Sequence, residues 1–468
     1  MSSLADWLIA GARHNPERMA LLGRPRGWSY LELAEHASRG AAHLRYSGLL
    51  AGDIACISSN PRDLALAALS CSLAGIVLFP LDPALGERRS ERLRGLAGER
   101  ARQLPPLPLE LPVRRIDWPE ETETETDPER VTLIIATSGS EGDPKAVMLT
   151  HGNLDRAAAA SNERLPLAPG DIWLACLPLH HIGGISPLFR CLRAGATLLL
   201  HEGFDANTVW ADLQKYPVTH ISLVPAMLSR LLDVADGTAQ PLAPPLALRH
   251  ALVGGAALSR TLFERARASG WPVCPTWGMS ECAAQAATLV HPDSNWREGD
   301  VGKPLPGVEC RVDADNRMHL RGPQVMAGYL NPQLQPGEGL EEGWLATNDL
   351  GRIEASGHIT VMGRADDILI SGGIKIHPLE IESCLGTCPG VSDVAVTAIA
   401  DPVWGDILVA LLVGTAEARV VAQWCRQHLA SSRQPRRLLK IEHLPRNALG
   451  KLERNKLRSL AGKTASLA

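Results

Sequence analysis

Glycines, hydroxyl side chains and a lysine are concentrated in one short segment, Thr137-Ser138-Gly139-Ser140-Glu141-Gly142-Asp143-Pro144-Lys145. The segment follows an apolar run at residues 131–135, which predicts a buried strand. Glycine reaches backbone angles that other residues avoid, so free N–H groups and the hydroxyls of Thr137, Ser138 and Ser140 can surround phosphate oxygens. Lys145 adds positive charge. The segment is therefore a candidate polyphosphate loop, although a Gly/Ser-rich turn that binds nothing has the same composition.

Further polar clusters stand where other apolar segments end. In open α/β sheets, ligands bind at the carboxyl ends of the strands, so we expect several of these clusters to converge there. In chain order they are His180-His181-Ile182-Gly183-Gly184, Gly254-Gly255-Ala256-Ala257, Thr276-Trp277-Gly278-Met279-Ser280-Glu281, Thr347-Asn348-Asp349, Ser371-Gly372-Gly373 and Asn447-Ala448-Leu449-Gly450-Lys451.

Length and composition narrow the class of protein. The 468 residues are too many for one hydrophobic core, so two or three domains are expected. The net charge of −4 argues against nucleic-acid binding, which usually needs a basic protein. The N-terminal residues lack the basic start and apolar region of a secretory signal. The longest apolar stretch, residues 64–81, contains Ser70, Ser72, Gly75 and Pro80, so it predicts a buried helix and a strand rather than a membrane span.

The ten cysteines are scattered along the chain, and only Cys384 and Cys388 stand close together. They lack the second pair or the neighbouring histidines that a zinc site requires. Buried, reduced thiols are therefore expected, as in a cytoplasmic protein.

The order of helical and β-rich patterns predicts the architecture. Up to about residue 300 they alternate, with β-rich runs at 197–200, 220–224, 248–253 and 273–276, which predicts an α/β domain with mainly parallel sheets. Short strands at 309–312, 317–320, 352–354 and 358–362 then predict a small antiparallel β sub-domain.

A polar break at Gly363-Arg364-Ala365-Asp366-Asp367 separates this part from a different pattern. Strands near 368, at 394–399 and at 407–413, with helices at 378–385 and 418–429, are enough for a small α+β domain. We therefore predict a large N-terminal domain, residues 1–365, and a small mobile C-terminal domain, residues 366–468.

The clusters, in this order between Thr137 and Lys451, resemble the adenylate-forming superfamily of acyl- and aryl-CoA ligases. Within it, Leu223-Val224-Pro225 and Val253-Gly254-Gly255-Ala256-Ala257 are similar to o-succinylbenzoate–CoA ligases. The C-terminal segments His377-Pro378-Leu379-Glu380-Ile381-Glu382 and Leu444-Pro445-Arg446-Asn447 look equally like halobenzoate–CoA ligases.

The resemblance implies a reaction in two halves. A carboxylate first attacks the α-phosphate of ATP, giving an acyl-adenylate and pyrophosphate, and the thiol of coenzyme A then displaces AMP. Negative charge grows on phosphoryl oxygens in the first half, so cations and hydroxyl donors should surround them.

The resemblance also implies the nucleotide-binding residues. Trp277 would stack on adenine, Asp349 and Arg364 would bind the ribose, and Glu281 would hold Mg²⁺, a hard cation suited to carboxylate and phosphate oxygens. Core packing for Trp277, a surface salt bridge for Glu281 and a structural ion pair for Asp349 and Arg364 are the alternatives. The remaining nucleotide contacts would come from Thr137, Ser138, Gly139, Ser140, Lys145, Gly255, Ala256, Thr276, Gly278 and Ser280.

Two positions depart from the pattern of the superfamily. Glu141 stands where a small hydroxyl residue is usual, and we expect its carboxylate to face solvent. Asn348 stands where glycine is usual, and we expect it to stiffen a turn beside Asp349.

The acyl pocket implied by the resemblance is narrow and suits a flat ring or a slim chain. His181 would separate this pocket from the coenzyme A tunnel, although a packed core histidine is the alternative. The predicted lining is His181, Ile182, Gly183, Ser222, Val224, Gly254, Gly255 and Met279. Arg190 is the one candidate cation for a second carboxylate.

The C-terminal domain would supply the remaining groups. Lys451 would bridge the carboxylate and the phosphate as a compact charge on a long stem, although an isolated lysine on a turn is usually only exposed. Gly372 and Gly373 would leave room for the pantetheine arm. Rotation at a hinge, Asp366, would withdraw Lys451 after adenylation and bring the two glycines in.

The resemblance therefore implies an enzyme with ATP, Mg²⁺ and coenzyme A as cofactors and an aromatic acid as substrate, best matched by o-succinylbenzoate, as in menaquinone synthesis. Another benzoate-type or medium-chain acid, a carrier protein as acyl acceptor, and a non-catalytic nucleotide binder are the alternatives. No nucleic-acid or membrane partner is expected, and a homodimer stays open.

Overall fold

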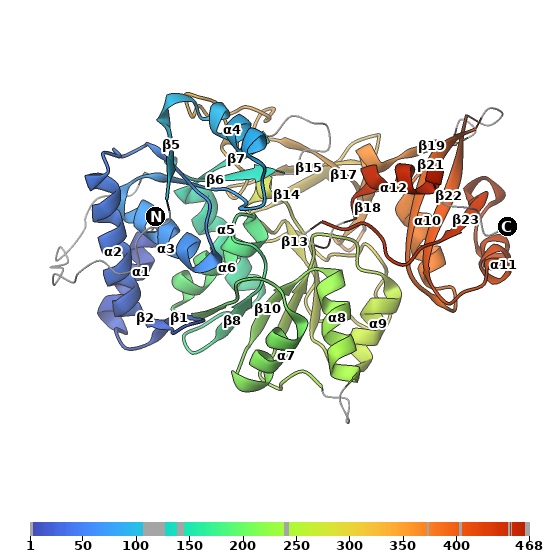
Figure 1. The fold of residues 1–468 in the computed structure, drawn as a ribbon, viewed down its shortest axis with the longest axis horizontal. Coiled ribbons are helices and arrows are strands. Elements are labelled where there is room, and N and C mark those ends of the chain that lie inside the picture. The colour runs from blue at the N-terminus through green and yellow to red at the C-terminus, as the bar shows by residue number, and fades with distance from the viewer. Residues whose placement is uncertain are drawn as a thin grey trace.

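The computed structural model describes residues 3–105, 127–137, 145–237, 243–371, 374–401, 405–447, 450 and 452–463. A large body occupies the left and centre of Figure 1, and the elements from β19 onward form a smaller body at the right. No described helix is long and apolar enough to cross a membrane. The boundary between residues 365 and 366 stays a prediction.

Two sheets organise the large body. Within the described residues, the larger sheet has six parallel strands, with an antiparallel strand at each edge. In spatial order its described strands are β13 Ala287–Thr288, β12 Val273–Trp277, β11 His250–Val253, β10 His220–Leu223, β8 Ile172–Ala175, β9 Thr197–Leu200, β1 Met19–Leu22 and β2 Trp28–Ser29.

The smaller sheet is parallel on one side and antiparallel on the other. Its described strands are, in order, β16 Gly328–Tyr329, β7 Lys145–Thr150, β6 Val131–Thr137, β4 Val77–Pro80, β3 Ile54–Ile57 and β5 Ala101–Leu104. The predicted α/β class with mainly parallel sheets is confirmed.

Helices cover both faces of the two sheets. One buried cluster joins the facing surfaces of the sheets through α1 Leu4–His14, α2 Tyr30–Tyr46, α3 Pro61–Ala74, α5 His151–Arg164 and α6 Ile182–Ala194. The outer faces are covered by α7 Ala206–Lys215, α8 Pro225–Asp236 and α9 Arg260–Ala268 on the larger sheet, and by α4 Glu87–Leu96 on the smaller one.

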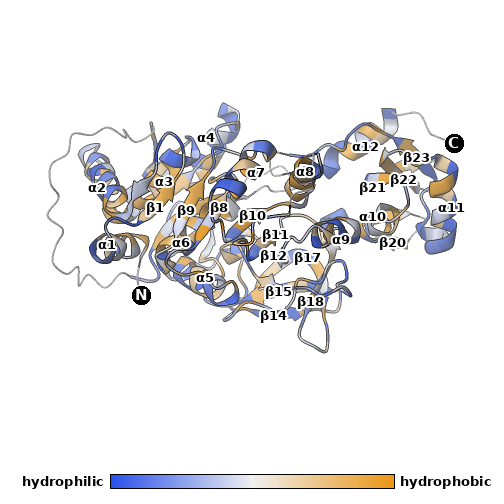
Figure 2. Ribbon diagram, turned by 90° about the horizontal axis from the view of Figure 1, so that it is seen from below, coloured by the Kyte–Doolittle hydropathy of each residue, from blue (hydrophilic) through white to orange (hydrophobic). Residues whose placement is uncertain are grey.

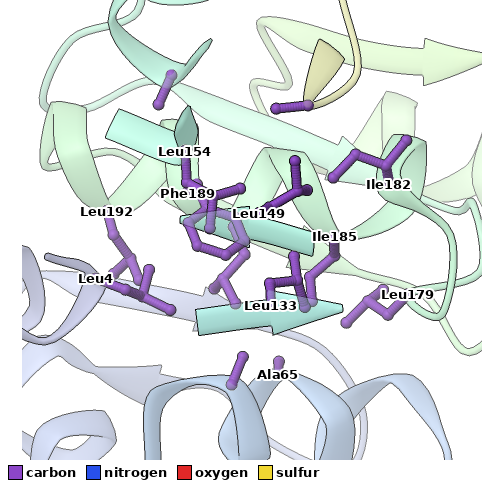
Figure 3. Close-up of a cluster of buried hydrophobic side chains, with 14 of the residues drawn as sticks. Leu4, Ala65, Leu133, Leu149, Leu154, Leu179, Ile182, Ile185, Phe189 and Leu192 are labelled. Carbon is purple, nitrogen blue, oxygen red and sulfur yellow. The ribbon is translucent and has the colours of Figure 1, made fainter. Parts of the chain in front are cut away.

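Figure 3 shows how α6 fills the space between the sheets. Ile185 and Phe189 from this helix lie near Leu133 of β6 and Leu149 of β7. Figure 2 shows the same organisation by hydropathy, because the orange strands lie inside and the helices carry blue outer faces. Such burial of apolar surface is the main stabilising contribution to the large body.

Local sequence signals fix the ends of several helices. Ser29 accepts a hydrogen bond from the Glu32 N–H, and the Glu32 side chain accepts one from the Ser29 N–H, which forms a capping box at the start of α2. Gly75 ends α3 in the left-handed conformation, and β4 begins two residues later. The predicted helix and strand within residues 64–81 are therefore confirmed.

The β sub-domain is an antiparallel sheet of described strands β14 Glu309–Val312, β15 Arg317–Arg321, β17 Leu345–Ile353 and β18 Ile359–Arg364. The turn expected at Asn348 is wrong, because β17 runs through it. Leu345 and Thr347 are buried while Ala346 and Asn348 are exposed, which is the alternation of a half-buried strand.

In its described part, the smaller body contains a three-stranded sheet and a two-stranded ribbon. Two clusters of buried residues, one on each side of this three-stranded sheet, hold the helices of the smaller body in place. Its described elements are β19 Leu369–Ser371, β20 Ile374–Ile376, α10 Pro378–Gly386, β21 Val391–Asp401, β22 Gly405–Gly414, α11 Ala418–His428, β23 Arg437–Lys440 and α12 Arg454–Lys463.

Candidate active site

Three predicted nucleotide-binding residues meet at the ends of different elements. Trp277 is the last residue of β12, and its indole N–H donates to the Asp349 carboxylate over 2.7 Å. Arg364, the last residue of β18, lies 3.5 Å from the other oxygen of Asp349. Strands that are far apart in sequence therefore bring together an aromatic ring, an acid and a guanidinium.

Glu281 stands beside this group on a single 3₁₀ turn, η2 Ser280–Cys282. Its carboxylate accepts a hydrogen bond of 3.2 Å from the Tyr329 hydroxyl. Burial raises the pKa of Glu281, and the negative charge of Asp349 adds to this effect. Ser280 begins the same turn, so its place next to Glu281 follows from the backbone.

Tyr329 also connects Glu281 to the candidate phosphate loop. The ammonium of Lys145 lies 5.1 Å from the centre of the Tyr329 ring, a cation–π geometry. Tyr329 pairs with Val147 across β16 and β7, so a single sheet edge carries both residues. A cation from one end of the loop and a carboxylate from η2 are thereby held on either side of one tyrosine.

The predicted phosphate loop connects two antiparallel strands. Thr137 ends β6 and pairs with Lys145 at the start of β7, and its hydroxyl donates to the Lys145 carbonyl over 3.3 Å. The predictions for Ser138, Gly139, Ser140 and Glu141 lie outside the described residues.

Gly278 is needed for backbone packing. A Cβ at this position would lie 1.6 Å from the Ala284 carbonyl oxygen, so any other residue would displace the loop. Ala283 and Ala284 have φ angles of 51° and 105°, which L-residues rarely adopt. Such strain collects at functional sites and is maintained by the surrounding structure.

The predicted acyl pocket begins beside the end of β11. A Cβ on Gly254 would lie 2.5 Å from Thr276 Cγ2, and Gly255 has a φ of +77°. The Thr276 hydroxyl itself is hydrogen-bonded to Ala287 and Thr288 of β13. Ala256 follows Gly255 and is half-buried. Thr276 therefore fixes the sheet edge beneath the two glycines.

Val224 joins this pocket to the C-terminal body. It precedes α8, and a Cβ on Gly255 would lie 3.4 Å from its Cγ1 atom. A Cβ on Gly450 would lie 3.0 Å from its Cγ2 atom and 3.3 Å from Ala226 Cβ. Residue 450, which directly precedes Lys451, therefore lies against the rim of the predicted pocket. Lys451 itself is outside the described residues.

Ser222 has a buried polar neighbourhood. Its hydroxyl accepts a 3.0 Å hydrogen bond from the indole N–H of Trp173. The guanidinium of Arg190 lies 5.0 Å from the centre of the same indole, and the residue is only 3% exposed. The His220 ring stacks on Trp173 at 4.9 Å, and its Nε2 has no hydrogen-bond partner among the described residues.

The other predicted pocket residues are positioned by α6 and by the loop after β12. His181 precedes α6, and burial lowers its pKa to about 4, so the ring is neutral at pH 7. The Ile182 side chain belongs to the core around α6 (Figure 3), whereas Gly183 is partly exposed. Met279 packs at the margin of the same core.

The predicted hinge is tied to the nucleotide-site residues. Arg364 donates two hydrogen bonds to Asp366, of 2.9 and 3.0 Å, while its third nitrogen approaches Asp349. Asp366 lies in the turn η3 Ala365–Asp367, between β18 and β19. Gly372 and Gly373 are not among the described residues.

The donor set fits a hard cation that the substrate helps to bind. No group of three potential metal-binding side chains exists in the described part of the chain. Glu281 is a half-buried carboxylate with a raised pKa, and it forms no ion pair with another described residue. One carboxylate plus phosphate oxygens suits Mg²⁺, which usually binds through one or two carboxylates and substrate phosphates.

Sequence reasoning missed two aromatic residues at this site. Tyr329 is one of only four tyrosines, and the sequence around it, Ala327-Gly328-Tyr329, has no chemical signature. Trp173 lies in an ordinary apolar run, and its link to Ser222 spans two neighbouring strands. Only the scarcity of aromatic residues could have indicated either one.

The fold and the comparisons with known proteins together identify an AMP-forming acid–CoA ligase. The sequence matches the AMP-binding enzyme family over residues 9–102 and 96–330, and the AMP-binding enzyme C-terminal domain over residues 380–451. The chain belongs to this family, so the predicted superfamily is confirmed.

Its similarity to individual members extends over the whole chain. It is 32% identical over 486 residues to a 2-succinylbenzoate–CoA ligase of Bacillus pumilus, covering 98% of each chain. The structure of o-succinylbenzoate CoA synthetase from Bacillus subtilis with its acyl-adenylate superposes with a TM-score of 0.84 at 29% identity, covering 98% and 99% of the two chains. The same enzyme with ATP and a magnesium ion gives a TM-score of 0.84 at 30% identity, over 96% and 98%.

Proposed function

We propose that this chain converts o-succinylbenzoate to its coenzyme A thioester through an acyl-adenylate, releasing pyrophosphate and then AMP. The observation that carries the choice of acid is Arg190, a buried cation beside the predicted acyl pocket. The curated and structural relatives support the same acid, because those reported above act on or bind succinylbenzoate or its adenylate.

Arg190 needs an anion that the described chain does not supply. No carboxylate of a described residue forms an ion pair with it, and its guanidinium lies over the face of Trp173. Burial lowers its pKa to about 9, so the side chain is still charged at neutral pH. An unpaired buried charge is unfavourable. A second carboxylate on the substrate would neutralise it, which selects a dicarboxylic acid.

Ser222 places this cation in relation to the pocket. Trp173 contacts Arg190 with its ring and Ser222 with its N–H, and Ser222 is two residues from Val224 on the pocket rim. The flat ring of an aryl acid can therefore occupy the space beside Gly254 and Gly255 while its second carboxylate is directed towards Arg190. This places the reacting carboxylate at the end nearer Gly450.

The proposed roles at the other end are those that the family resemblance implies, and the proximity of Trp277, Asp349 and Arg364 supports them. Trp277 provides a ring for adenine, Asp349 and Arg364 bind the ribose hydroxyls, and Lys145 with the loop 138–144 surrounds the phosphates. Lys451, next to Gly450, approaches the carboxylate and the α-phosphate. A carboxylate oxygen then forms the new bond to phosphorus as the bond to pyrophosphate breaks.

The second half-reaction needs a different side of the C-terminal body. The thiol sulphur of coenzyme A bonds to the acyl carbon, its proton is lost and AMP leaves. His181, neutral at pH 7, separates the pocket from the incoming thiol, and Gly372 and Gly373 admit the pantetheine arm. When bound, Mg²⁺ neutralises phosphate charge, and Glu281 would hold it.

A panel of acids tests the proposal directly. We expect acid-dependent exchange of labelled pyrophosphate into ATP to be strongest with o-succinylbenzoate, and weaker with benzoate, halobenzoates and medium-chain acids. A clear preference for one of the monocarboxylic acids would reject the proposed substrate. Coenzyme A should accept the acyl group, whereas acceptance only by a phosphopantetheinyl carrier protein would favour a carrier-loading enzyme.

Arg190→Met provides a sharper test of the same point. We expect kcat/KM for o-succinylbenzoate to fall by about 100-fold or more, as for a broken buried ion pair, while that for benzoate does not fall. Arg193→Met is the matched control, because Arg193 lies on the same helix and pairs with Asp155 at 2.8 Å. Equal losses with both acids in Arg190→Met would contradict the assigned role.

A further inference from the structure

Described residues on the two sides of Lys451 are hydrogen-bonded to one another. Arg446 and Leu452 form an antiparallel bridge across it. The Gly450 N–H donates to the Asn447 carbonyl over 2.8 Å, and Gly450 has a φ of +71°. Hydrogen bonds between described residues therefore flank the position of Lys451, which itself lies outside the described residues.

Arg446 fastens the first side of the segment around Lys451. One guanidinium nitrogen donates to the Gly450 carbonyl over 3.0 Å, and another donates to both carboxylate oxygens of Asp393, over 3.0 and 2.8 Å. Asp393 belongs to β21, which pairs with β22 in the three-stranded sheet of the C-terminal body. The guanidinium thus connects the carbonyl next to Lys451 to a rigid sheet.

Arg454 fastens the second side, three residues after Lys451. It begins α12 and donates to the two carboxylate oxygens of Glu382 over 2.9 and 2.8 Å. Its Nε atom lies 3.0 Å from Asp367, the residue after the predicted hinge. Glu382 is 8% exposed and also accepts the Val396 N–H over 2.7 Å, so the pair is fixed from several directions.

These contacts define a geometry more than they add stability. Burial opposes the charge of Arg454, and Glu382 with Asp367 outweighs that effect, so the pKa of Arg454 is raised. A buried ion pair adds little net stability compared with apolar residues of the same shape. A planar guanidinium with two parallel hydrogen bonds does fix distance and angle, which a catalytic segment needs.

Arg454 also connects this segment to the predicted hinge. Arg454 contacts Asp367, while Asp366 is held by Arg364 of the large body. Because Asp367 follows the hinge, its bond to Arg454 belongs to the C-terminal body and is kept when that body rotates. Lys451 would therefore move together with the C-terminal body when that body rotates.

We propose that Arg446 and Arg454 are positioning residues that hold Lys451 for the adenylation half-reaction. The proposal rests on the proposed role of Lys451. It predicts a defect confined to one half of the reaction, because Gly372 and Gly373, which serve the other half, lie outside the bridged segment.

The experiment compares both half-reactions in the full-length enzyme. For Arg454→Lys, which keeps the charge but loses the paired hydrogen bonds, and for Arg446→Gln, we expect kcat of pyrophosphate exchange to fall about 10–100-fold, as for a small misplacement of a catalytic group. KM for ATP should change less than about 3-fold, and thioester formation from supplied acyl-adenylate less than about 2-fold.

Two further variants make the result decisive. Arg458→Ala, one turn farther along α12, removes a pair with Asp406 at 3.2 Å and should leave both half-reactions unchanged. The double variant Glu382→Gln with Arg454→Met leaves no unpaired buried charge, so it should fold and still lose adenylation alone. Equal loss of both half-reactions in the Arg446 and Arg454 variants, or no loss of adenylation in any of them, would overturn the proposal.

Lys451→Ala separates this inference from the proposed function. We expect it to reduce adenylation by several orders of magnitude and to spare thioester formation. If adenylation survives in Lys451→Ala, the role of the lysine is wrong. If adenylation is lost there but persists in the arginine variants, only the positioning role is wrong.

Discussion

The indole N–H of Trp277 donates to Asp349 over 2.7 Å, although the two residues are 72 positions apart. Trp277 is 7% exposed and ends a parallel strand of the large body, while Asp349 lies on an antiparallel strand of the sub-domain. The residue proposed to stack on adenine therefore also fixes the acid proposed to bind ribose. A substitution of Trp277 should therefore change the position of the Asp349 carboxylate as well.

Substitution of Trp277 by Phe separates these two roles. Phe keeps an aromatic face and removes the donor, and a hydrogen bond to a charged group contributes about 1.5–3 kcal/mol. We expect KM for ATP to rise about 10-fold and the preference for ATP over 3′-deoxy-ATP to shrink, because Asp349 is no longer oriented. Pyrophosphate exchange with both nucleotides measures this.

The control for Trp277→Phe is Trp424→Phe. That substitution also removes an indole hydrogen bond, from Trp424 to the Cys384 carbonyl at 3.1 Å, but in the C-terminal body. Its KM for ATP should match that of the unmodified enzyme. An unchanged preference for ATP over 3′-deoxy-ATP in Trp277→Phe would show that the hydrogen bond has no role in ribose binding.

The buried carboxylate of Glu281 should lower the stability of the ligand-free folded protein. Burial raises the pKa of Glu281, and Asp349 raises it further, so its charged form is disfavoured in the ligand-free protein. Because the folded-state pKa is raised, this destabilisation develops as pH rises through it and is absent below the unfolded value. We expect Glu281→Gln to melt higher than the unmodified protein at pH 7 and at the same temperature near pH 4.

The same variant should lose the response to nucleotide. Mg²⁺ with ATP should raise the melting temperature of the unmodified protein and have little effect on Glu281→Gln, whose adenylation should fall about 100-fold or more. Glu309→Gln, an exposed residue paired with Arg321, serves as the control. A Glu281→Gln variant that melts lower at pH 7 would contradict the assigned electrostatics.

Much of the fold could be predicted because it depends on local patterns. Short apolar runs predicted the strands around 197–200 and 220–224, and turn signals predicted the strands of the sub-domain. The turn at Asn348 was wrong because one polar pair, Asn348 and Asp349, interrupts the apolar pattern of β17. A strand with an exposed face tolerates such a pair.

The contacts between site residues could not be predicted in the same way. The bonds from Trp277 to Asp349 and from Tyr329 to Glu281 join segments that only the packing of separate sheets brings together. The resemblance supplied the residue types, but the side-chain partners depend on the relative position of whole strands. The contacts of Arg446 and Arg454 could not be predicted for the same reason, since each of these arginines binds an acid more than fifty positions away.

Asp366→Pro should impair the second half-reaction more than the first. Proline fixes φ near −65° and restricts the rotation that the hinge requires. We expect thioester formation to fall at least about 10-fold while pyrophosphate exchange changes less. Asp366→Asn is the control, because it removes the charge and one of the two acceptor oxygens that face Arg364 and keeps the backbone free. Unchanged thioester formation in Asp366→Pro would remove the case for a hinge at this residue.

The stability of the large body should fall in mild acid because of its buried histidines. Burial lowers the pKa of His220 to about 3, and His250 and Arg249 lower it further; burial also lowers the pKa values of His151 and His250 to about 4. Between about pH 6.5 and 4 the unfolded chain therefore binds protons that the folded chain excludes, and the free energy of unfolding falls as pH falls.

His220→Gln isolates one such contribution. Each excluded proton changes the free energy of unfolding by about 1.4 kcal/mol per pH unit, so the variant should lose about 2 kcal/mol less than the unmodified protein between pH 6.5 and pH 5. Urea unfolding followed by tryptophan fluorescence measures the difference. His14→Gln, at an exposed position of α1, should leave the slope unchanged. Parallel pH profiles for His220→Gln and the unmodified protein would show that His220 takes up its proton in the folded state, contrary to its burial against Trp173.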